Sequence, residues 1–311
     1  MWQDDFRQTR SEPLKFHFEQ FLEFRRAAIK ASTAETYRTD QAAFFRWADA
    51  RGLTVQSITR SNIAEWMAHA QSSQSNGTIM SRLAILRSFL AWAEDQGLRV
   101  GNPVEIKKLP RLKSPPADRQ PFTEDEFRRL LQAAEGHPFW APAIQIGWFS
   151  GLRMGDVAGL LWAEVDLQAG IITRRAMKTS QTHAPKVVPI DPELRFVLIR
   201  LYNGPEREGS LFVLPAMQSL YQQARTQLCE GFKRLSGRAG VQNGHFHRLR
   251  HSFVSKLINA GVSTVTIQSM TGQSLPVLAK YAHVSTEAKR EALAKASSLP
   301  QNAISLLTNE A

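Results

Sequence analysis

Cysteine is almost missing from this sequence: Cys229 is the only one in 311 residues. A single thiol excludes an internal disulfide framework and a zinc site built from several cysteines, and it fits a reducing compartment. Long apolar runs are also missing, because no stretch approaches the roughly 18 residues that a membrane span needs. Residues 1–5 carry acid where a secretory signal needs base and an apolar run. We therefore expect a soluble, cytoplasmic protein.

Acidic residues are fewer than basic ones. The chain has 28 Asp and Glu against 39 Lys and Arg, which gives a formal net charge of +11. The excess is uneven, since residues 1–102 carry a net charge of only +2 and the remainder carries +9. Such a balance favours a polyanionic partner, usually nucleic acid and less often an anionic membrane. If the partner is DNA, we expect the second part of the chain to make more of the backbone contacts.

The first hundred residues have the pattern of a helical domain. Apolar residues at helical spacing predict about four helices within residues 13–100. Ser32 or Thr33 is a candidate cap for a helix that runs to Trp47, and Thr59 opens the next one. The last of the four extends over residues 75–96.

Residues 102–121 break this pattern, because prolines recur in them and cannot lie inside helices. The basic residues of the segment are Lys107, Lys108, Arg111 and Lys113. We interpret it as a basic linker that contacts DNA, with a solvated loop as the simpler alternative. Beyond it, Thr123 and Glu126 have the pattern of a capping box. Two short β-like runs, at 170–173 and 186–190, then indicate a hairpin, so the expected fold class is mainly α with a small β-sheet or hairpin.

Three short stretches contain residue types suited to phosphate chemistry. They are residues 150–157, residues 177–179, and residues 247–253, with a tyrosine some 30 residues further on. The candidate residues in them are Arg153, Lys178, His247, Arg250 and Tyr281. Each stretch is a weak signal alone, but their order and spacing together resemble the tyrosine recombinase (phage integrase) family. The resemblance covers nearly the whole chain.

The resemblance implies a helical core-binding domain followed by a mixed α/β tyrosine recombinase catalytic domain. The expected division is 1–101 for the N-terminal core DNA-binding domain, 102–121 for the basic linker, 122–298 for the catalytic domain and 299–311 for a C-terminal tail. Family members clamp double-stranded DNA and assemble on it as dimers to tetramers, so DNA and further copies of this chain are the expected partners. The tail is expected to dock on a neighbouring protomer, and a frayed end is the alternative.

The chemistry explains why these residue types recur. The guanidinium forks of Arg153 and Arg250 match phosphate oxygens and can stabilise the charge of a transition state. His247, three residues before Arg250, lies on the same helix face and offers a donor or a base. By the resemblance, Lys178 is the general acid for the departing 5′-oxygen, and Tyr281 is the nucleophile. Exchanging a phosphodiester for a phosphotyrosine bond is nearly energy-neutral, so neither a cofactor nor a metal is expected.

Further positions belong to this expected site. Asp156, one turn after Arg153, is a candidate to orient it, and His251 is a candidate buttress. Gln273 stands where the family usually has His and less often Trp; an amide can donate to a phosphoryl oxygen but cannot serve as an acid or base. The interval from Gln273 to Tyr281 is one residue shorter than usual, and we expect Pro276 to disturb the helix that carries the tyrosine.

An active site-specific recombinase or integrase, of the kind that mobile genetic elements carry, is the preferred interpretation, because the remaining catalytic positions are all filled. Two alternatives stay open at this point. One is a catalytically impaired DNA-binding regulator on the same scaffold, which the glutamine favours. The other is a monomeric type IB topoisomerase, which shares the chemistry but lacks site preference.

Overall fold

The chain divides into two compact units, Met1–Ala117 and Asp118–Ala311. The computed structural model describes residues 12–105, 109, 112, 120–174, 185–279 and 281, except for the Glu206 side chain. The predicted linker contacts, Lys107, Lys108, Arg111 and Lys113, lie outside the described residues, as do Lys178 and the tail 299–311. No helix within the described ranges is long and apolar enough to cross a membrane.

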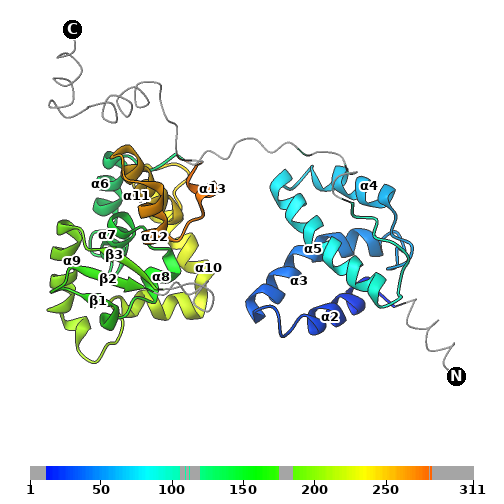
Figure 1. Ribbon diagram of the computed structural model, residues 1–311, viewed down its shortest axis with the longest axis horizontal. Helices are drawn as coiled ribbons and strands as arrows, with labels where there is room; N and C mark the ends of the chain where they lie inside the picture. Colours follow the sequence, from blue (N-terminus) through cyan, green and yellow to red (C-terminus); the bar gives the residue numbers. More distant parts are fainter. Residues whose placement is uncertain are drawn as a thin grey trace, which may run out of the picture. The chain divides into compact units, whose positions relative to one another are not determined.

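The first unit is helical, as the apolar spacing predicts, and is coloured blue to cyan in Figure 1. Its helices are α2 (Leu14–Phe24), α3 (Ala31–Asp49), α4 (Arg60–Ala70) and α5 (Asn76–Asp95). They bury a core of their own, rich in aromatic rings. Phe18 and Phe89 meet edge to face with ring centroids 5.3 Å apart, and Phe44 meets Trp66 in the same way at 5.3 Å. Such edge-to-face pairs add to the stabilisation that burial alone provides.

Local capping explains where these helices begin. The Thr59 hydroxyl accepts from the Asn62 amide, and the Asn62 side chain accepts in return from the Thr59 amide. This reciprocal pair satisfies two N–H groups that would otherwise lack partners. The prediction that Ser32 or Thr33 caps α3 is wrong. The Thr33 amide already donates to the Lys30 carbonyl, so the helix is under way by Ala31 and has no side-chain cap.

The second unit combines helices with a small sheet (green to orange in Figure 1). Its helices are α6 (Glu124–Ala133), α7 (Trp140–Ser150), α8 (Met154–Ala158), α9 (Pro192–Tyr202), α10 (Pro215–Arg238), α11 (His247–Asn259), α12 (Thr264–Thr271) and α13 (Leu275–Leu278), with short 3-10 turns at η2 (Trp162–Glu164) and η3 (Pro205–Arg207). The strands β1 (Val165–Asp166), β2 (Ile171–Arg174) and β3 (Lys186–Pro189) form an antiparallel sheet in the order β1-β2-β3. The capping box at Thr123 and Glu126 opens α6 as predicted.

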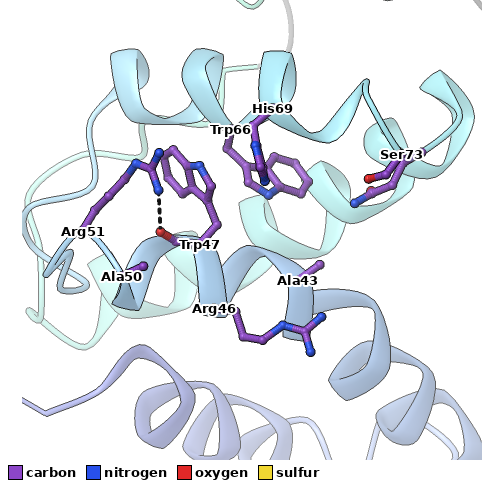
Figure 2. Close-up of a pocket in the computed structure, with 9 residues that line it drawn as sticks. Ala43, Arg46, Trp47, Ala50, Arg51, Trp66, His69 and Ser73 are labelled. Carbon is purple, nitrogen blue, oxygen red and sulfur yellow. Dashed lines mark hydrogen bonds between the residues drawn. The ribbon is translucent and has the colours of Figure 1, made fainter.

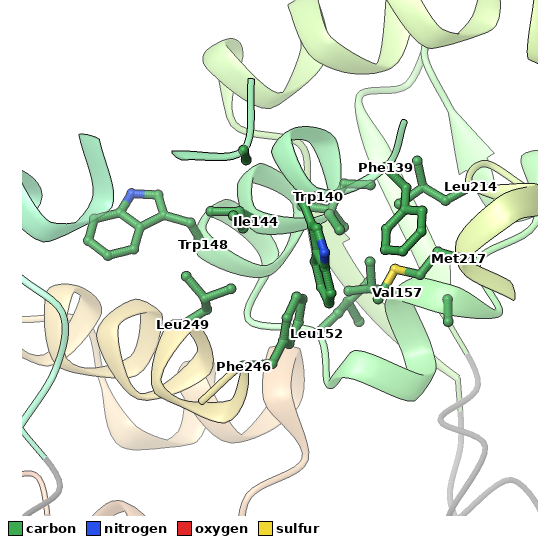
Figure 3. Packing of buried hydrophobic residues seen from close by; sticks show 14 of the residues in the cluster. Phe139, Trp140, Ile144, Trp148, Leu152, Val157, Leu214, Met217, Phe246 and Leu249 are labelled. Carbon is green, nitrogen blue, oxygen red and sulfur yellow. The ribbon is translucent and has the colours of Figure 1, made fainter. Parts of the chain in front are cut away.

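Close packing of α7 on α11 supports the site. Figure 3 shows Trp140 of α7, Leu249 of α11 and Phe246, the residue just before α11, meeting in the core. A β-carbon added at Gly147 of α7 would lie 3.0 Å from the Leu249 side chain and 3.1 Å from the Phe246 ring. The two backbones therefore approach closely, and α11 is held rigidly against the end of α7.

Candidate active site

Arg250 is the most deeply buried cation among the described residues of the second unit. Only 2% of its surface is exposed. Its Nη1 donates to the Gly151 carbonyl at 2.7 Å and its Nη2 donates to the Thr271 carbonyl at 2.8 Å. Gly151 directly follows α7 and Thr271 is the last residue of α12. The final carbonyls of a helix lack intrahelical partners and carry partial negative charge, so two helix ends fix this guanidinium.

Arg153 lies beside this arrangement at the start of α8. Its Nη1 is 3.9 Å from Oδ2 of the buried Asp156, one turn further on. This separation is an ion pair but is too long for a hydrogen bond. Arg153 Nη1 and Arg250 Nε are both buried and have no hydrogen-bond acceptor among the residues that the structure describes. Fixed N–H groups of this kind are ready donors for an anion.

The Tyr281 hydroxyl contacts α11, the helix that carries Arg250. We refer to Arg153, Arg250 and the groups around them as the cluster. The tyrosine hydroxyl hydrogen-bonds to Nδ1 of His251, which is 5% exposed. His247, one turn earlier on α11, meets the His251 ring edge to face with centroids 4.7 Å apart. Although His247 lies at the surface, desolvation by surrounding protein, followed by the charges of His251, Arg250 and Arg153, lowers its pKa to about 4. It is therefore neutral near pH 7 and can accept a proton.

Lys186, the first residue of β3, is a member of this cluster that the sequence reasoning missed. Its Nζ donates to the Thr271 carbonyl at 2.7 Å, the same oxygen that Arg250 uses. Burial lowers the pKa of Lys186 to about 8, with further lowering from Arg250 and Arg153 and opposition from Asp156. Burial and Arg153 likewise lower the pKa of Arg250 to about 10. Three cations thus share one small region, an arrangement that favours binding of an anion.

Gln273 comes two residues after Thr271, whose carbonyl accepts from both Lys186 and Arg250. It is 8% exposed, and its amide Oε1 is buried without a hydrogen-bond partner in the described part of the chain. Its backbone N–H reaches the Thr271 hydroxyl at 3.3 Å. The side chain therefore belongs to the wall of the site, where its amide oxygen has unused acceptor capacity.

The structure brings together most of the residues that the sequence singled out. Those placed in or beside the cluster are Arg153, Asp156, His247, Arg250, His251, Gln273 and Tyr281. Lys178 lies outside the described residues. Across the described ranges, no three His, Cys, Asp or Glu side chains gather as metal ligands.

Pro276 does not disturb a helix that carries the tyrosine, contrary to expectation. It lies in the first turn of α13, where a missing N–H costs nothing, and α13 ends at Leu278. Tyr281 follows in a turn, with its N–H donating to the Leu278 carbonyl at 2.9 Å. Among the described residues, Tyr281 is therefore held by a turn and by its contact with His251.

The first unit contributes a separate basic pocket between α3 and α4. Figure 2 shows Arg46, Arg51 and His69 around it, with Arg51 reaching back over its own helix. The Arg51 guanidinium lies 4.2 Å from the centre of the Trp47 ring and donates to the Trp47 carbonyl at 3.2 Å. The two arginines of this pocket suit a polyanion that passes along the surface.

Comparison with known proteins agrees with this architecture. Residues 120–288 match the model of the phage integrase family, and residues 17–97 match the N-terminal SAM-like domain of phage integrases. A tyrosine recombinase XerC-like protein of Caldanaerobacter subterraneus subsp. tengcongensis is 23% identical over 307 residues, covering 86% of this chain and 78% of that protein. Tyrosine recombinase XerC of Xanthomonas campestris pv. campestris is 25% identical over 253 residues, covering 79% and 76%.

Solved structures show the same fold. The Tn1549 transposon integrase in complex with a circular intermediate DNA superposes with a TM-score of 0.69 at 17% identity, covering 90% of this chain and 98% of that one. A lambda integrase dimer bound to a core site gives a TM-score of 0.69 at 18% identity, covering 86% and 94%. Since the family model spans more than half of its length, this chain is a member of the phage integrase family, the tyrosine recombinases.

Proposed function

We propose that this protein is a site-specific recombinase that cleaves and rejoins DNA through a covalent 3′-phosphotyrosine at Tyr281. One observation carries the proposal: a tyrosine hydroxyl lies beside a cluster of cations with unused N–H donors. Arg153 Nη1 and Arg250 Nε have no acceptor within the described residues, and the Tyr281 hydroxyl already contacts His251 on the same helix as Arg250. A phosphodiester bound between the arginines would lie within reach of that hydroxyl.

The cleavage step follows from this placement. The Tyr281 oxygen attacks phosphorus while the bond from phosphorus to the 5′-oxygen breaks. The tyrosine proton passes to the imidazole of His251, which contacts the hydroxyl and packs against the ring of His247. The arginines stabilise the charge that develops on the non-bridging oxygens. Rejoining is the same step in reverse, with a 5′-hydroxyl as the attacking group, so the phosphodiester energy is conserved.

Two assignments extend the proposal. Lys178 protonates the departing 5′-oxygen, a role carried over from the family resemblance. Gln273 donates its amide N–H to a non-bridging oxygen where relatives use a ring N–H, which its burial at the wall of the site supports. An amide does not titrate, so this donor contributes equally at every pH.

The partners follow from the charge and from the relatives. The solved lambda integrase structures are a dimer on a core site and a tetramer on a Holliday junction. We propose that this chain likewise assembles on double-stranded DNA as dimers and tetramers. The basic linker residues of 102–121 and the pocket between α3 and α4 then contact the phosphate backbone, and residues 299–311 dock on a neighbouring protomer. The single cysteine agrees with action in the cytoplasm.

The test uses nicked suicide duplexes tiled from the DNA that flanks the gene. Cleavage releases a short 5′ fragment, so religation cannot occur and covalent protein–DNA complexes accumulate on denaturing gels. We expect a covalent band with the wild type and with Tyr202→Phe, a control at a half-exposed helix end, and no band with Tyr281→Phe. Sequence-selective binding without a covalent product on any duplex would instead identify a DNA-binding regulator and refute the proposal.

A further inference from the structure

We propose that Lys186 is a positioning residue of this site: it fixes the turn that leads from α12 into Gln273 and joins that turn to the β2–β3 hairpin. The inference rests on the proposed function and deepens it. It assigns a role to a lysine outside the motifs that the sequence analysis singled out.

The first support is a shared carbonyl. Lys186 Nζ and Arg250 Nη2 both donate to the Thr271 oxygen, at 2.7 Å and 2.8 Å. Thr271 is 1% exposed and ends α12, so its carbonyl is one of the orphan acceptors at the negative end of the helix. Two cations from different elements, β3 and α11, therefore hold one peptide group between them.

The second support is the close approach of Lys186 to Gly272. Gly272 has φ +64°, in the left-handed region that favours glycine. A β-carbon at this position would collide with Cε and Nζ of Lys186. The lysine side chain thus lies directly across the backbone of the turn, and the next residue is Gln273, whose position the turn sets.

The third support is the charge balance. A neutral donor would satisfy the Thr271 carbonyl as well as an ammonium does. A second cation beside Arg250 is costly because it is buried, and this burial lowers the pKa of Lys186 to about 8. The charged groups that act on Lys186 are Arg250, Arg153 and Asp156, so positive charge exceeds negative charge. An ammonium in this place is accounted for when the site binds a phosphate, which offsets the repulsion among the three cations.

Lys186 also occupies a defined place in the hairpin. It is the first residue of β3 and pairs with Arg174, the last residue of β2. The segment that connects them contains Lys178, the proposed general acid. Anchoring Lys186 to Thr271 therefore fixes the start of β3 beside Arg250.

The first experiment measures single-turnover cleavage of the nicked duplex. We expect Lys186→Met to slow formation of the covalent complex on the order of tenfold to hundredfold, the size of effect that a small misplacement of reacting groups produces. Lys186→Arg should recover much of the rate, because it can still donate to the Thr271 carbonyl. Unfolding temperatures of both variants within a few degrees of wild type, and unchanged DNA binding, would show that the loss is one of positioning. A wild-type rate for Lys186→Met would overturn the inference.

A change of leaving group separates positioning from acid catalysis. In a duplex with sulfur in place of the bridging 5′-oxygen, the thiolate leaves without needing a proton. The Lys186→Met deficit should persist on this substrate, whereas the Lys178→Met deficit should largely disappear. Restoration of Lys186→Met by sulfur would overturn the inference, because Lys186 would then be the proton donor itself.

A double-variant cycle tests the contact with Gly272. Gly272→Ala should slow cleavage in the wild type, since its β-carbon displaces Lys186, and should slow it much less in a Lys186→Ala background. Gly261→Ala is the matched control, because Gly261 also has a positive φ (+76°) but open space around it. Strictly additive losses at 186 and 272 would contradict the shared role. If the wild type itself forms no covalent complex, the proposed function fails. If the wild type forms the complex and the Lys186 variants form it at the same rate, only the positioning role fails.

Discussion

Substitution of Gly151 by alanine gives a prediction whose size can be worked out from the structure. Gly151 follows α7 with φ +64°, and its carbonyl accepts the Nη1 hydrogen bond of Arg250 at 2.7 Å. An L-residue in this conformation costs about 1–2 kcal/mol. The added β-carbon would also collide with the ring of Phe253, and overpacking a well-packed region costs about 1–3 kcal/mol. We expect Gly151→Ala to destabilise the second unit by about 2–5 kcal/mol in all.

The matched control is Gly136→Ala. Gly136 has a comparable φ of +72° but nothing within 4 Å of an added β-carbon, so only the backbone cost of about 1–2 kcal/mol remains. Hydrogen exchange measured by mass spectrometry across a urea series reads the free energy of opening for peptides of α7 and α11. The double variant Gly151→Ala/Phe253→Leu should recover part of the loss by removing the ring. Equal destabilisation by Gly151→Ala and Gly136→Ala would refute the reasoning.

The remaining predictions concern charge. Arg153→Lys should reduce the cleavage rate about 10²–10³-fold by removing a fixed donor. Folding should stay intact because 32% of the Arg153 side chain is exposed. Single-turnover rates test the first expectation and a thermal melt tests the second; a wild-type cleavage rate would contradict the prediction. The pKa of His247 is about 4 in the folded protein, below its usual 6.5, so the unfolded chain binds a proton first as the pH falls. The free energy of unfolding should therefore decrease as the pH drops from about 6.5 to 4. Urea titrations should show a flatter decline for His247→Asn, and an unchanged slope would count against the prediction. Arg99 is 9% exposed and donates to three backbone carbonyls, at 2.6, 2.7 and 3.2 Å. Arg99→Met should therefore destabilise the first unit by about 2–4 kcal/mol. The expected readout is faster hydrogen exchange in α4 and α5 but not in α11.

The sequence predicted the parts of the fold that depend on local chemistry. Side-chain caps at Thr59 and Thr123 predicted where α4 and α6 begin, because a cap is a short-range event between residues three apart. Apolar spacing predicted a helix over 75–96, where the structure has α5. The two β-like runs became β2 and β3. The pair Val165–Asp166, which forms β1, is too short to show a period of two. The break in α10 at Ala224 has neither proline nor glycine to mark it.

The candidate site was predicted through motifs, and what was missed follows from long-range contacts. Lys186 stands at the start of an apolar β-like run and gives no sign that its ammonium reaches a carbonyl 85 residues away. The oxygens of Gly151 and Thr271 that hold Arg250 are backbone groups, which no side-chain pattern encodes. His251 was expected as a buttress, but its contact with Tyr281 depends on how a turn 30 residues further on folds back. Only tertiary structure supplies these partners.

The hydrogen bond between His251 and Tyr281 has a consequence for how subunits share the work. Both residues belong to one chain, so the proposed nucleophile contacts a histidine on the helix that carries Arg250 of the same protomer. We therefore expect each subunit of an assembly to cut the strand that it holds. A mixed assembly of Tyr281→Phe and Arg153→Lys protomers contains no subunit with both groups intact, and we expect that mixing them does not rebuild a site. The number of strands cut should then equal the number of intact subunits, which would make subunit composition a direct control on the outcome.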